Sequence, residues 1–555
     1  MSLPCPAGDR VVARDPLAVP VLALFVVACL LILSTVHTGD PDLWGHVVYG
    51  QEALAAGRLP ATATHTYTAP AHPWINHENA SEIVFAILVN RFGPAGLTGL
   101  TIALGASVVL AFVSRAIRAG VRVPALLAVV LLAVCNMTPG WSVRPQVFTY
   151  GSFALLLVLL DGAFAAPGRR WLLWTVPPLF AVWANTHGGF LAGLGVLVVY
   201  LGVSAAGATR REALGMAAVV VLAVLATLVN PYGIRLLTWL VEDLRPPRPE
   251  ISEWGRMMPP DPVFFVFAAL VLLTVFALVR TRRRRDWAHV AVLAVTACEA
   301  VAHSRHVVFF GIAAGLFVPV HLDDVWSAPA SRDAPAPGSV RRMRAVAWSM
   351  AGVFLAVLLF LCRTLWVSKA AYPVDAFQYL ADRGVAGRIV ADFGWAQYAL
   401  AAFPESSVAF DGRLRTSYPQ DVADAYFDFL LGDLPGMRWR SPTSPPFDDR
   451  RILRLGNPDM VLLGRGEKHA LKVMARATSE WVLLYEDGVA QIWGRRSVYD
   501  DPRSARYLAP GLRSVSRRRP DGWVRWPAFP ARQRSRQRDA AAVSAAADRV
   551  GGRSG

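Results

Sequence analysis

Long apolar runs separated by short polar connections fill the first two thirds of the chain. A helix needs roughly 20 residues, at 1.5 Å per residue, to cross a hydrocarbon core, and most of these runs approach that length. The pattern therefore predicts a membrane domain with about eleven spans, some of them short. The predicted spans are 17–37, 95–117, 123–138, 145–165, 171–185, 188–207, 212–230, 262–280, 287–303, 306–322 and 345–366.

Arginine is unevenly distributed among the connections between these runs. When the connections are assigned alternately from a cytoplasmic N-terminus, every dense basic cluster of this region falls on one side, and short cytoplasmic loops carry such an excess of Lys and Arg. These clusters include Arg115 and Arg118, Arg169 and Arg170, and the run Arg282–Arg285. The other face receives most of the acidic and histidine side chains, so we expect the polar chemistry to be extracytoplasmic.

Composition agrees with an integral membrane protein. The chain is 54% hydrophobic and only 17% charged, with a mean hydropathy of +0.38, which is unlike a soluble domain of this length. The net charge of +16 does not indicate nucleic-acid binding, because much of the excess lies in the cytoplasmic turns and the last forty residues.

The character of the chain changes near Lys369, where apolar runs shorten and charges interleave with them. GRIVAD, SVAFDG, DMVLLG, WVLLYED and VAQIWGR have the length and composition of strands, whereas VDAFQYLADRG, QDVADAYFDFLLGD and EKHALKVMARA have helical spacing. We therefore predict a small extracytoplasmic α/β domain. The full predicted division is a cytoplasmic tail at 1–16, a membrane domain at 17–368 with its first external loop at 38–94, the α/β domain at 369–500, and a basic, partly disordered tail at 501–555.

The first external loop is the richest in groups that do chemistry. Asp40 and Asp42 leave the first span, LWGHVVYGQEALAAG follows as a predicted interfacial helix with His46 in it, and His77 and Glu78 precede a second amphipathic segment, SEIVFAILVNRFG. Carboxylates close to hydrocarbon are costly to ionise, which makes them functional candidates. Asp42 has an equally plain structural interpretation as the N-cap of the helix that follows it.

Later external helix ends repeat this pattern of gathered polar side chains. The segments are SVRPQ with Arg144, WANTHGG with Asn185 and His187, NPYG, ISEW, and HSRH with Arg305 and His306. Arginine offers a planar fork that matches phosphate oxygens, so these residues are candidates for holding a phosphate. Each segment also has a structural interpretation, since Asn-Pro-Tyr-Gly is a turn signal and the glycines after His187 permit close helix packing.

The order of these motifs resembles a group of bacterial multi-span proteins with the C-type glycosyltransferase architecture. The resemblance rests on DPDLWGHVVYGQ, PWINHENASE, RPQVF, WANTHGGF, NPYG and ISEW, and on GRIVADFGWAQYALAAFPESSVAFDGR in the C-terminal part. It implies a multi-pass protein of the bacterial plasma membrane with an extracytoplasmic C-terminal domain. The chain departs from the family at ATATHTY, where a second acid is missing, and at Asn79-Ala80. The resemblance therefore leaves open whether a divalent metal takes part.

The same resemblance implies a transfer reaction in which the sugar comes from a polyprenyl-phosphate donor and passes to a glycan, lipid or protein acceptor of the cell envelope. Asp40, Asp42 and Glu78 are then the candidate catalytic acids. His46, His77, Arg144, Asn185, His187, Arg305 and His306 are the candidate substrate-binding residues. A transporter or flippase and a non-catalytic assembly protein remain alternatives. In the α/β domain, Asp392, Trp395, Asp411 and Arg413 follow predicted strands, where side chains bind ligands or stabilise turns.

Overall fold

The computed structural model describes residues 16–35, 38–326, 337–434 and 436–531. Nearly all of the predicted cytoplasmic tail at 1–16 and the end of the predicted basic tail lie outside these residues. The chain forms two compact units. The first comprises the described parts of Met1–His37, His77–Val84 and Leu88–Thr364, and the second comprises Thr38–Asn76, Phe85–Ile87 and the described part of Leu365–Gly555.

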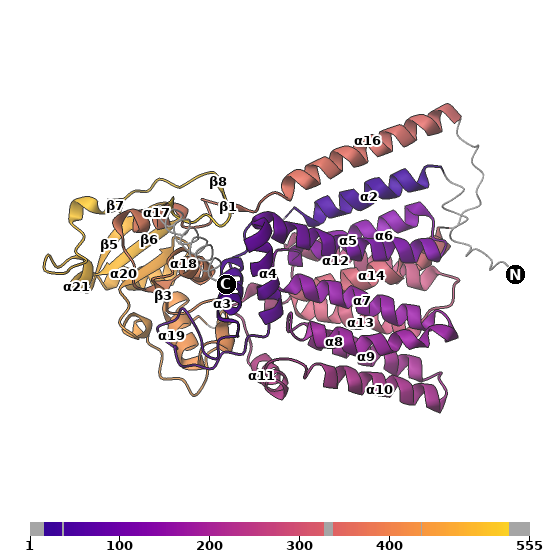
Figure 1. Ribbon diagram of the computed structural model, residues 1–555, viewed down its shortest axis with the longest axis horizontal. Helices are drawn as coiled ribbons and strands as arrows, with labels where there is room; N and C mark the ends of the chain where they lie inside the picture. Colours follow the sequence, from indigo (N-terminus) through magenta and orange to yellow (C-terminus); the bar gives the residue numbers. More distant parts are fainter. Residues whose placement is uncertain (1–15, 36–37, 327–336, 435, 532–555) are drawn as a thin grey trace, which may run out of the picture. The chain divides into compact units, whose positions relative to one another are not determined.

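The first unit is helical, and most of its helices lie side by side in Figure 1. Four short 3-10 segments join them, η1 (Thr138–Gly140), η2 (Pro167–Thr175), η3 (Ser252–Trp254) and η4 (Ser304–His306). The helices are α2 (Ala18–Leu33), α4 (Asn79–Phe92), α5 (Pro94–Arg118), α6 (Val123–Met137), α7 (Gln146–Phe164), α8 (Val176–Trp183), α9 (Phe190–Ala205), α10 (Arg210–Ala226), α11 (Ile234–Leu244), α12 (Pro262–Arg280), α13 (Trp287–Ala302), α14 (Val307–Phe317), α15 (Pro319–Val325) and α16 (Pro337–Leu361).

Every predicted span is at least partly helical, but fewer helices qualify as membrane spans than the eleven predicted. Among the described residues, five are long and apolar enough, or up to six if the bent pair of α14 and α15 counts as one span. The apolar helices α2, α9 and α13 have only 16 residues each, or about 24 Å of rise. The run predicted at 171–185 is divided into η2 and α8, because Pro177 and Pro178 lack backbone N–H groups and favour the start of a helix.

The second unit is built around a six-stranded mixed sheet with the order β3-β2-β4-β6-β5-β7, and β1 pairs with β8 in a separate ladder. Strands β3, β2 and β4 are parallel to one another, so their carboxyl ends lie at the same edge. The strands are β1 (Trp366–Ser368), β2 (Arg388–Ala391), β3 (Ser407–Val408), β4 (Met460–Gly464), β5 (Trp481–Glu486), β6 (Ala490–Arg495), β7 (Ser514–Val515) and β8 (Trp523–Arg525). The helices are α3 (Leu43–Ala56), α17 (Val374–Arg383), α18 (Ala396–Ala402), α19 (Gln420–Leu430), α20 (Lys468–Arg476) and α21 (Arg496–Tyr499).

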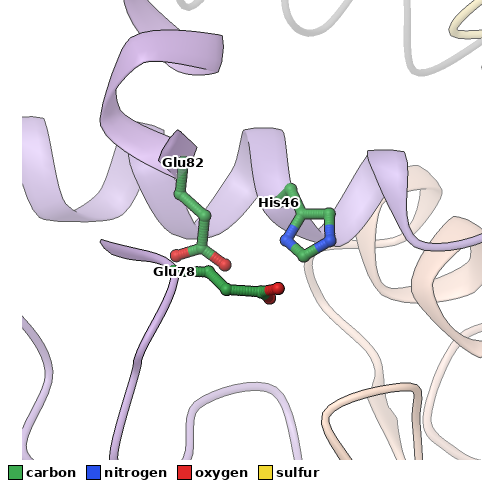
Figure 2. A group of neighbouring side chains, drawn as sticks. All are labelled: His46, Glu78 and Glu82. Carbon is green, nitrogen blue, oxygen red and sulfur yellow. The ribbon is translucent and has the colours of Figure 1, made fainter. Parts of the chain in front are cut away.

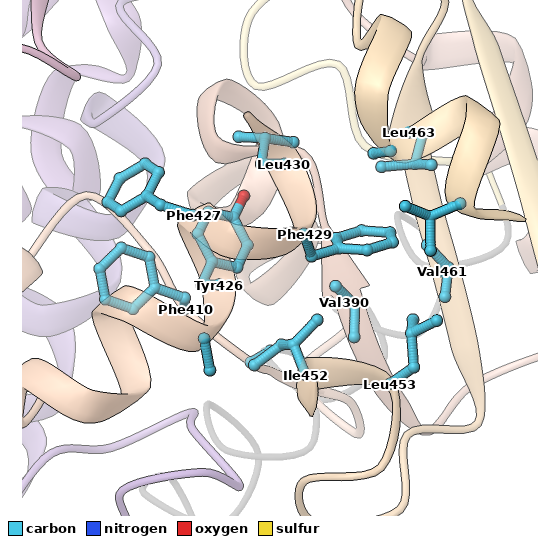
Figure 3. Close-up of a cluster of buried hydrophobic side chains, with 14 of the residues drawn as sticks. Val390, Phe410, Tyr426, Phe427, Phe429, Leu430, Ile452, Leu453, Val461 and Leu463 are labelled. Atoms are coloured by element: carbon cyan, nitrogen blue, oxygen red, sulfur yellow. The ribbon is translucent and has the colours of Figure 1, made fainter. Parts of the chain in front are cut away.

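One face of this sheet packs against α19 and α20. Val390, Val461 and Leu463 contribute to a core that includes Phe429 and Leu430 of α19 (Figure 3). Strand β4 is buried at every position, as expected for a central strand that is covered on both faces. All five predicted strands and all three predicted helices of this region are confirmed.

Residues 38–76 of the predicted first external loop form part of the second unit. Val408 of β3 donates a backbone hydrogen bond to His65 at 2.9 Å, and Thr66 forms a parallel bridge with Val408, so this part of the loop extends the edge of the sheet. The Trp44 ring of α3 stacks on Tyr398 at 4.6 Å between centroids. The predicted helix in the loop is confirmed as α3, and a large part of its contacts is with the α/β region.

Candidate functional site

In the first unit, Glu78 lies between two histidines from different segments. Glu78 Oε1 is 3.8 Å from His77 Nε2 and 3.6 Å from His187 Nε2. The Nδ1 atom of His187 accepts a hydrogen bond from the Gly189 N–H at 2.9 Å, so the neutral ring carries its proton on Nε2, facing Glu78. We call His77, Glu78 and His187 the histidine cluster.

The histidine cluster forms because the start of α4 is joined to the segment WANTHGG. The Ala80 N–H donates to the Asn185 carbonyl at 3.0 Å, and the Ser81 hydroxyl donates to the Thr186 carbonyl. The Asn185 amide itself donates to the carbonyls of Ala181 and Val229. Asn185 therefore stabilises helix ends, whereas its neighbour His187 faces the carboxylate.

The glycines after His187 have the packing role that the sequence offered as an alternative. A Cβ atom at residue 189 would lie 2.6 Å from the Thr149 side chain, which is too close for any real contact. Thr149 Oγ1 in turn lies 2.9 Å from His187 Nδ1. The same close approach therefore fixes the orientation of the imidazole.

Two glutamates mark the beginning of α4. Glu78 precedes the helix, and Glu82 is a buried residue of its first turn whose backbone N–H donates to the Glu78 carbonyl at 3.0 Å. Figure 2 shows both side chains, together with His46 of α3. Carboxylate oxygens are the usual ligands of hard divalent cations. Glu78 and Glu82 are therefore the residues of α4 with the chemistry to hold one.

A second cluster in the first unit joins two arginines through one acid. Arg144 Nη1 is 3.5 Å from Glu253 Oε2, and Arg305 Nη1 is 3.3 Å from Glu253 Oε1. The guanidinium of Arg305 also lies over the Trp254 ring, at 4.7 Å from its centroid. We call Arg144, Glu253 and Arg305 the arginine cluster.

The motif ISEW is held to the motif HSRH by direct hydrogen bonds. The Ser304 hydroxyl donates to the Glu253 carbonyl at 3.1 Å, and His303 Nδ1 is 2.8 Å from the Trp254 carbonyl. His306 forms a different contact, with its Nδ1 3.4 Å from Glu299 Oε2. Three of the predicted segments, SVRPQ, ISEW and HSRH, therefore converge at the arginine cluster.

The remaining segment, NPYG, forms a turn. The Asn230 side chain accepts from the Tyr232 N–H at 2.7 Å and donates to the Gly233 carbonyl, and Gly233 has a positive φ of 55°. This is the structural role that the sequence indicated for an Asn-Pro-Tyr-Gly segment.

The arginine and histidine clusters are both connected to the beginning of α7. Arg144 lies just before this helix, and Thr149, which contacts His187, lies in its first turn.

Comparison with known proteins identifies no relative. No protein-family model matches the chain, and no curated protein matches it. The candidate sites are therefore defined by geometry and chemistry alone.

Asp40 and Asp42 belong to the second unit. Asp42 occupies the N-cap position of α3, but its side chain makes no capping hydrogen bond. The Asp40 carboxylate instead accepts the Asp42 N–H at 3.1 Å. The capping role that the sequence offered for the Asp42 side chain is therefore wrong. His46, also on α3, is buried and lies edge-on to Phe85.

The strand-end residues Asp411 and Arg413 pair with each other. Arg413 Nη2 is 2.7 Å from Asp411 Oδ2, and the two side chains are 5% and 0% exposed. Burial alone would raise the pKa of the Asp411 carboxyl, but the Arg413 guanidinium lowers this pKa by more than burial raises it. The pKa therefore lies below its usual range. Arg413 also donates to the Thr64 carbonyl at 2.7 Å and lies over the Tyr49 and Trp74 rings. This pair therefore joins the first loop to the α/β region.

Asp392 and Glu467 follow the parallel strands β2 and β4. The Asp392 carboxylate accepts the Gly394 N–H at 3.0 Å and the Gly464 N–H at 3.2 Å. Burial raises the pKa of Asp392. Burial, together with the charge of Asp392, raises the pKa of Glu467 to about 7. Asp392 thus stabilises two turns at the carboxyl edge of the sheet, and Glu467 lies next to it.

Replacing Glu467 with glutamine is expected to stabilise the second unit above pH 7. The folded protein holds the Glu467 proton more tightly than the unfolded chain, whose pKa is near 4.5. The stabilising contribution of this group is therefore fully present below pH 4.5 and is lost as the pH rises through about 7. Hydrogen exchange of β4 at pH 4.5 and 8 measures the difference, with the exposed Glu480→Gln as control. An unchanged pH dependence would refute the assignment.

The sequence analysis missed a charged network inside the helices of the first unit. Arg115 of α5 binds Asp161 of α7 with Nε–Oδ2 and Nη2–Oδ1 distances of 2.9 and 3.0 Å. His289 of α13 is 3.2 Å from Asp161, and the Tyr200 hydroxyl is 3.2 Å from His289 Nε2. The four residues lie on four different helices, so only the packing of these helices brings them together.

Proposed function

We propose that the protein is a membrane glycosyltransferase that moves a sugar from a polyprenyl-phosphate donor to an acceptor of the bacterial cell envelope, on the extracytoplasmic side of the plasma membrane. The observation that carries this proposal is the arginine cluster, in which Arg144 and Arg305 from distant parts of the chain point at one carboxylate. The proposal includes a membrane domain in which all of the predicted apolar segments, short helices among them, lie in the bilayer.

The arginine cluster is suited to exchange its carboxylate for a phosphate. Its two N–O distances of 3.3 and 3.5 Å are longer than the 2.9 and 3.0 Å of the bidentate Arg115–Asp161 pair in the same unit. Charge-assisted hydrogen bonds of full strength have lengths of about 2.7–2.9 Å. The contacts of Glu253 are therefore loose, and a phosphate with more acceptor oxygens would bind both guanidinium groups more tightly.

The proposed reaction is a single displacement with inversion at the anomeric carbon. An acceptor hydroxyl oxygen forms the new bond to that carbon, and the bond from the carbon to the phosphate oxygen breaks. Asp42 takes the hydroxyl proton as general base, and the polyprenyl phosphate leaves with the electron pair of the broken bond. Arg144 and Arg305 stabilise the charge that develops on the phosphate, and His77 and His187 contribute further donors. Asp40 and Glu78 are further candidate catalytic acids.

Replacing Arg305 with alanine is expected to lower kcat/KM for the donor by about 10²–10³-fold, because one donor to the developing charge is lost. The measurement is transfer of labelled sugar from a series of polyprenyl-phosphate donors into membrane acceptors. Arg256→Ala is the matched control, since Arg256 is exposed and only three residues from Glu253. Equal rates for the two variants would exclude the arginine cluster as the phosphate site. No transfer by the wild-type protein with any donor would exclude the enzyme.

The charged network around Asp161 favours a second candidate function, that of a transporter or flippase. Ionisable residues inside membrane helices mark transport pathways in many proteins. The short bidentate contact between Arg115 and Asp161 is also what a purely structural pair would show. Transport of a labelled lipid-linked sugar that is abolished by Asp161→Asn, while transfer is absent, would support the transporter.

A further inference from the structure

Helix α3 of the first loop contacts the α/β region through two glycines. A Cβ atom at residue 45, in α3, would lie 1.9 Å from Gln397 Oε1. A Cβ atom at residue 412, after β3, would lie 2.2 Å from Asp42 Oδ1 and 2.9 Å from Gln397 Nε2. Real Cβ atoms essentially never approach other atoms so closely, so a side chain at either position would displace the Gln397 amide or the Asp42 carboxylate. The absent side chains leave room for the Asp42 carboxylate and the Gln397 amide, which lie next to each other at Gly412.

Gln397 is an unusual residue for this position. It lies in α18, is 2% exposed, and belongs to a helix that is otherwise apolar apart from Tyr398. Its Oε1 atom has no hydrogen-bond partner among the described residues. An unsatisfied buried acceptor costs about 1–3 kcal/mol. A methionine or leucine would fill the same volume without that cost, so packing alone does not explain a glutamine here.

The backbone at Gly412, next to the Asp42 carboxylate, is held in place by its two neighbours in the chain. Gly412 lies between Asp411 and Arg413, whose side chains form the buried ion pair described above. The Arg413 N–H also donates to Asp411 Oδ1 at 2.9 Å, which closes a turn around Gly412. The backbone next to the Asp42 carboxylate is therefore held by a buried ion pair and a turn hydrogen bond.

We propose that Gln397 and Gly412 are positioning residues that orient the Asp42 carboxylate. This inference rests on the proposed function of Asp42 as general base, and it assigns the α/β region a direct part in catalysis. The Gly412 backbone and the Gln397 amide both lie next to the carboxylate.

Two substitutions test the positioning. In Gly412→Ala, the new methyl group displaces the carboxylate by about 1 Å, and a shift of this size is expected to lower kcat by about 10²-fold with little change in KM for the donor. In Gln397→Glu, a second carboxylate next to Asp42 disfavours ionisation, so the acidic limb of the pH–rate profile is expected to move up by about one pH unit. Gln397→Met, which keeps the volume, is expected to leave that limb in place.

Gly511→Ala is the matched control, because Gly511 is in the same unit and a Cβ atom there would meet nothing within 4 Å. Hydrogen exchange of residues 43–47 in the full-length protein gives a readout that does not depend on activity. Gly412→Ala is expected to speed this exchange, and Gly511→Ala to leave it unchanged. If exchange responds but the wild type transfers no sugar, the contact is real and the proposed function fails. If Asp42→Asn abolishes transfer while the Gly412 and Gln397 variants keep the wild-type kcat and pH profile, the positioning inference is wrong.

Discussion

Asp42→Asn is expected to lower sugar transfer by about 10²–10⁴-fold, the usual contribution of a general base. Asparagine keeps the size of the side chain but cannot take the proton of the acceptor hydroxyl. Donor binding should be little affected, so the loss should be in kcat. The measurement is initial-rate transfer of labelled sugar by purified full-length protein in lipid, with the hydrogen-exchange pattern of α3 as a check that the variant folds.

Asp40→Asn is the control for this experiment. Asp40 Oδ1 accepts the Asp42 N–H at 3.1 Å, and asparagine retains an oxygen that can accept it. We therefore expect less than about a tenfold loss for Asp40→Asn, a cost near that of one weakened hydrogen bond. If instead Asp40→Asn abolishes transfer and Asp42→Asn retains it, the base is Asp40, and the positioning assigned to Gln397 and Gly412 loses its purpose.

Arg413→Ala is expected to destabilise the second unit by about 3–5 kcal/mol, because it leaves the fully buried Asp411 carboxylate without its counter-charge. The substitution also removes the hydrogen bond to the Thr64 carbonyl and the contacts with the Tyr49 and Trp74 rings. The first loop should therefore lose protection together with the sheet. Hydrogen exchange of α3, β2 and β4 in the full-length protein measures both effects.

The control for Arg413 is an ion pair of the same residue types at the surface. Arg503 Nε is 3.2 Å from Asp501 Oδ1, but the Arg503 side chain is 91% exposed. Arg503→Ala should leave the stability close to that of the wild type, because a surface ion pair contributes little. Adding Asp411→Ala to Arg413→Ala should recover part of the lost stability, since no unpaired buried charge remains. A loss below about 1 kcal/mol for Arg413→Ala would show that the pair does not hold the loop.

Several features were predictable because they depend on neighbours in the sequence. Hydrophobic periodicity predicted the helices of the first unit and the strands and helices of the α/β region, including α3 and α4 in the first loop. The alternation of the connections predicted that SVRPQ, ISEW and HSRH would lie on one face, and Arg144 and Arg305 of these segments both contact Glu253. The same patterns predicted more spans than the five or six helices of the described residues that are long and apolar enough to qualify, because hydropathy does not show where prolines divide a run or how short a helix is.

The sequence by itself determined a mostly helical chain with apolar spans, a following α/β region, and polar segments at helix ends. Only the tertiary structure decided which of these segments are partners. It joined residues 38–76 to the α/β region through Arg413, placed Gln397 and Gly412 against Asp42, and brought Arg115, Asp161 and His289 together within apolar helices. These contacts connect residues that are tens to hundreds of positions apart. Local periodicity carries no information about such pairs, because each depends on how separately formed helices and strands pack and on which buried charges must be neutralised.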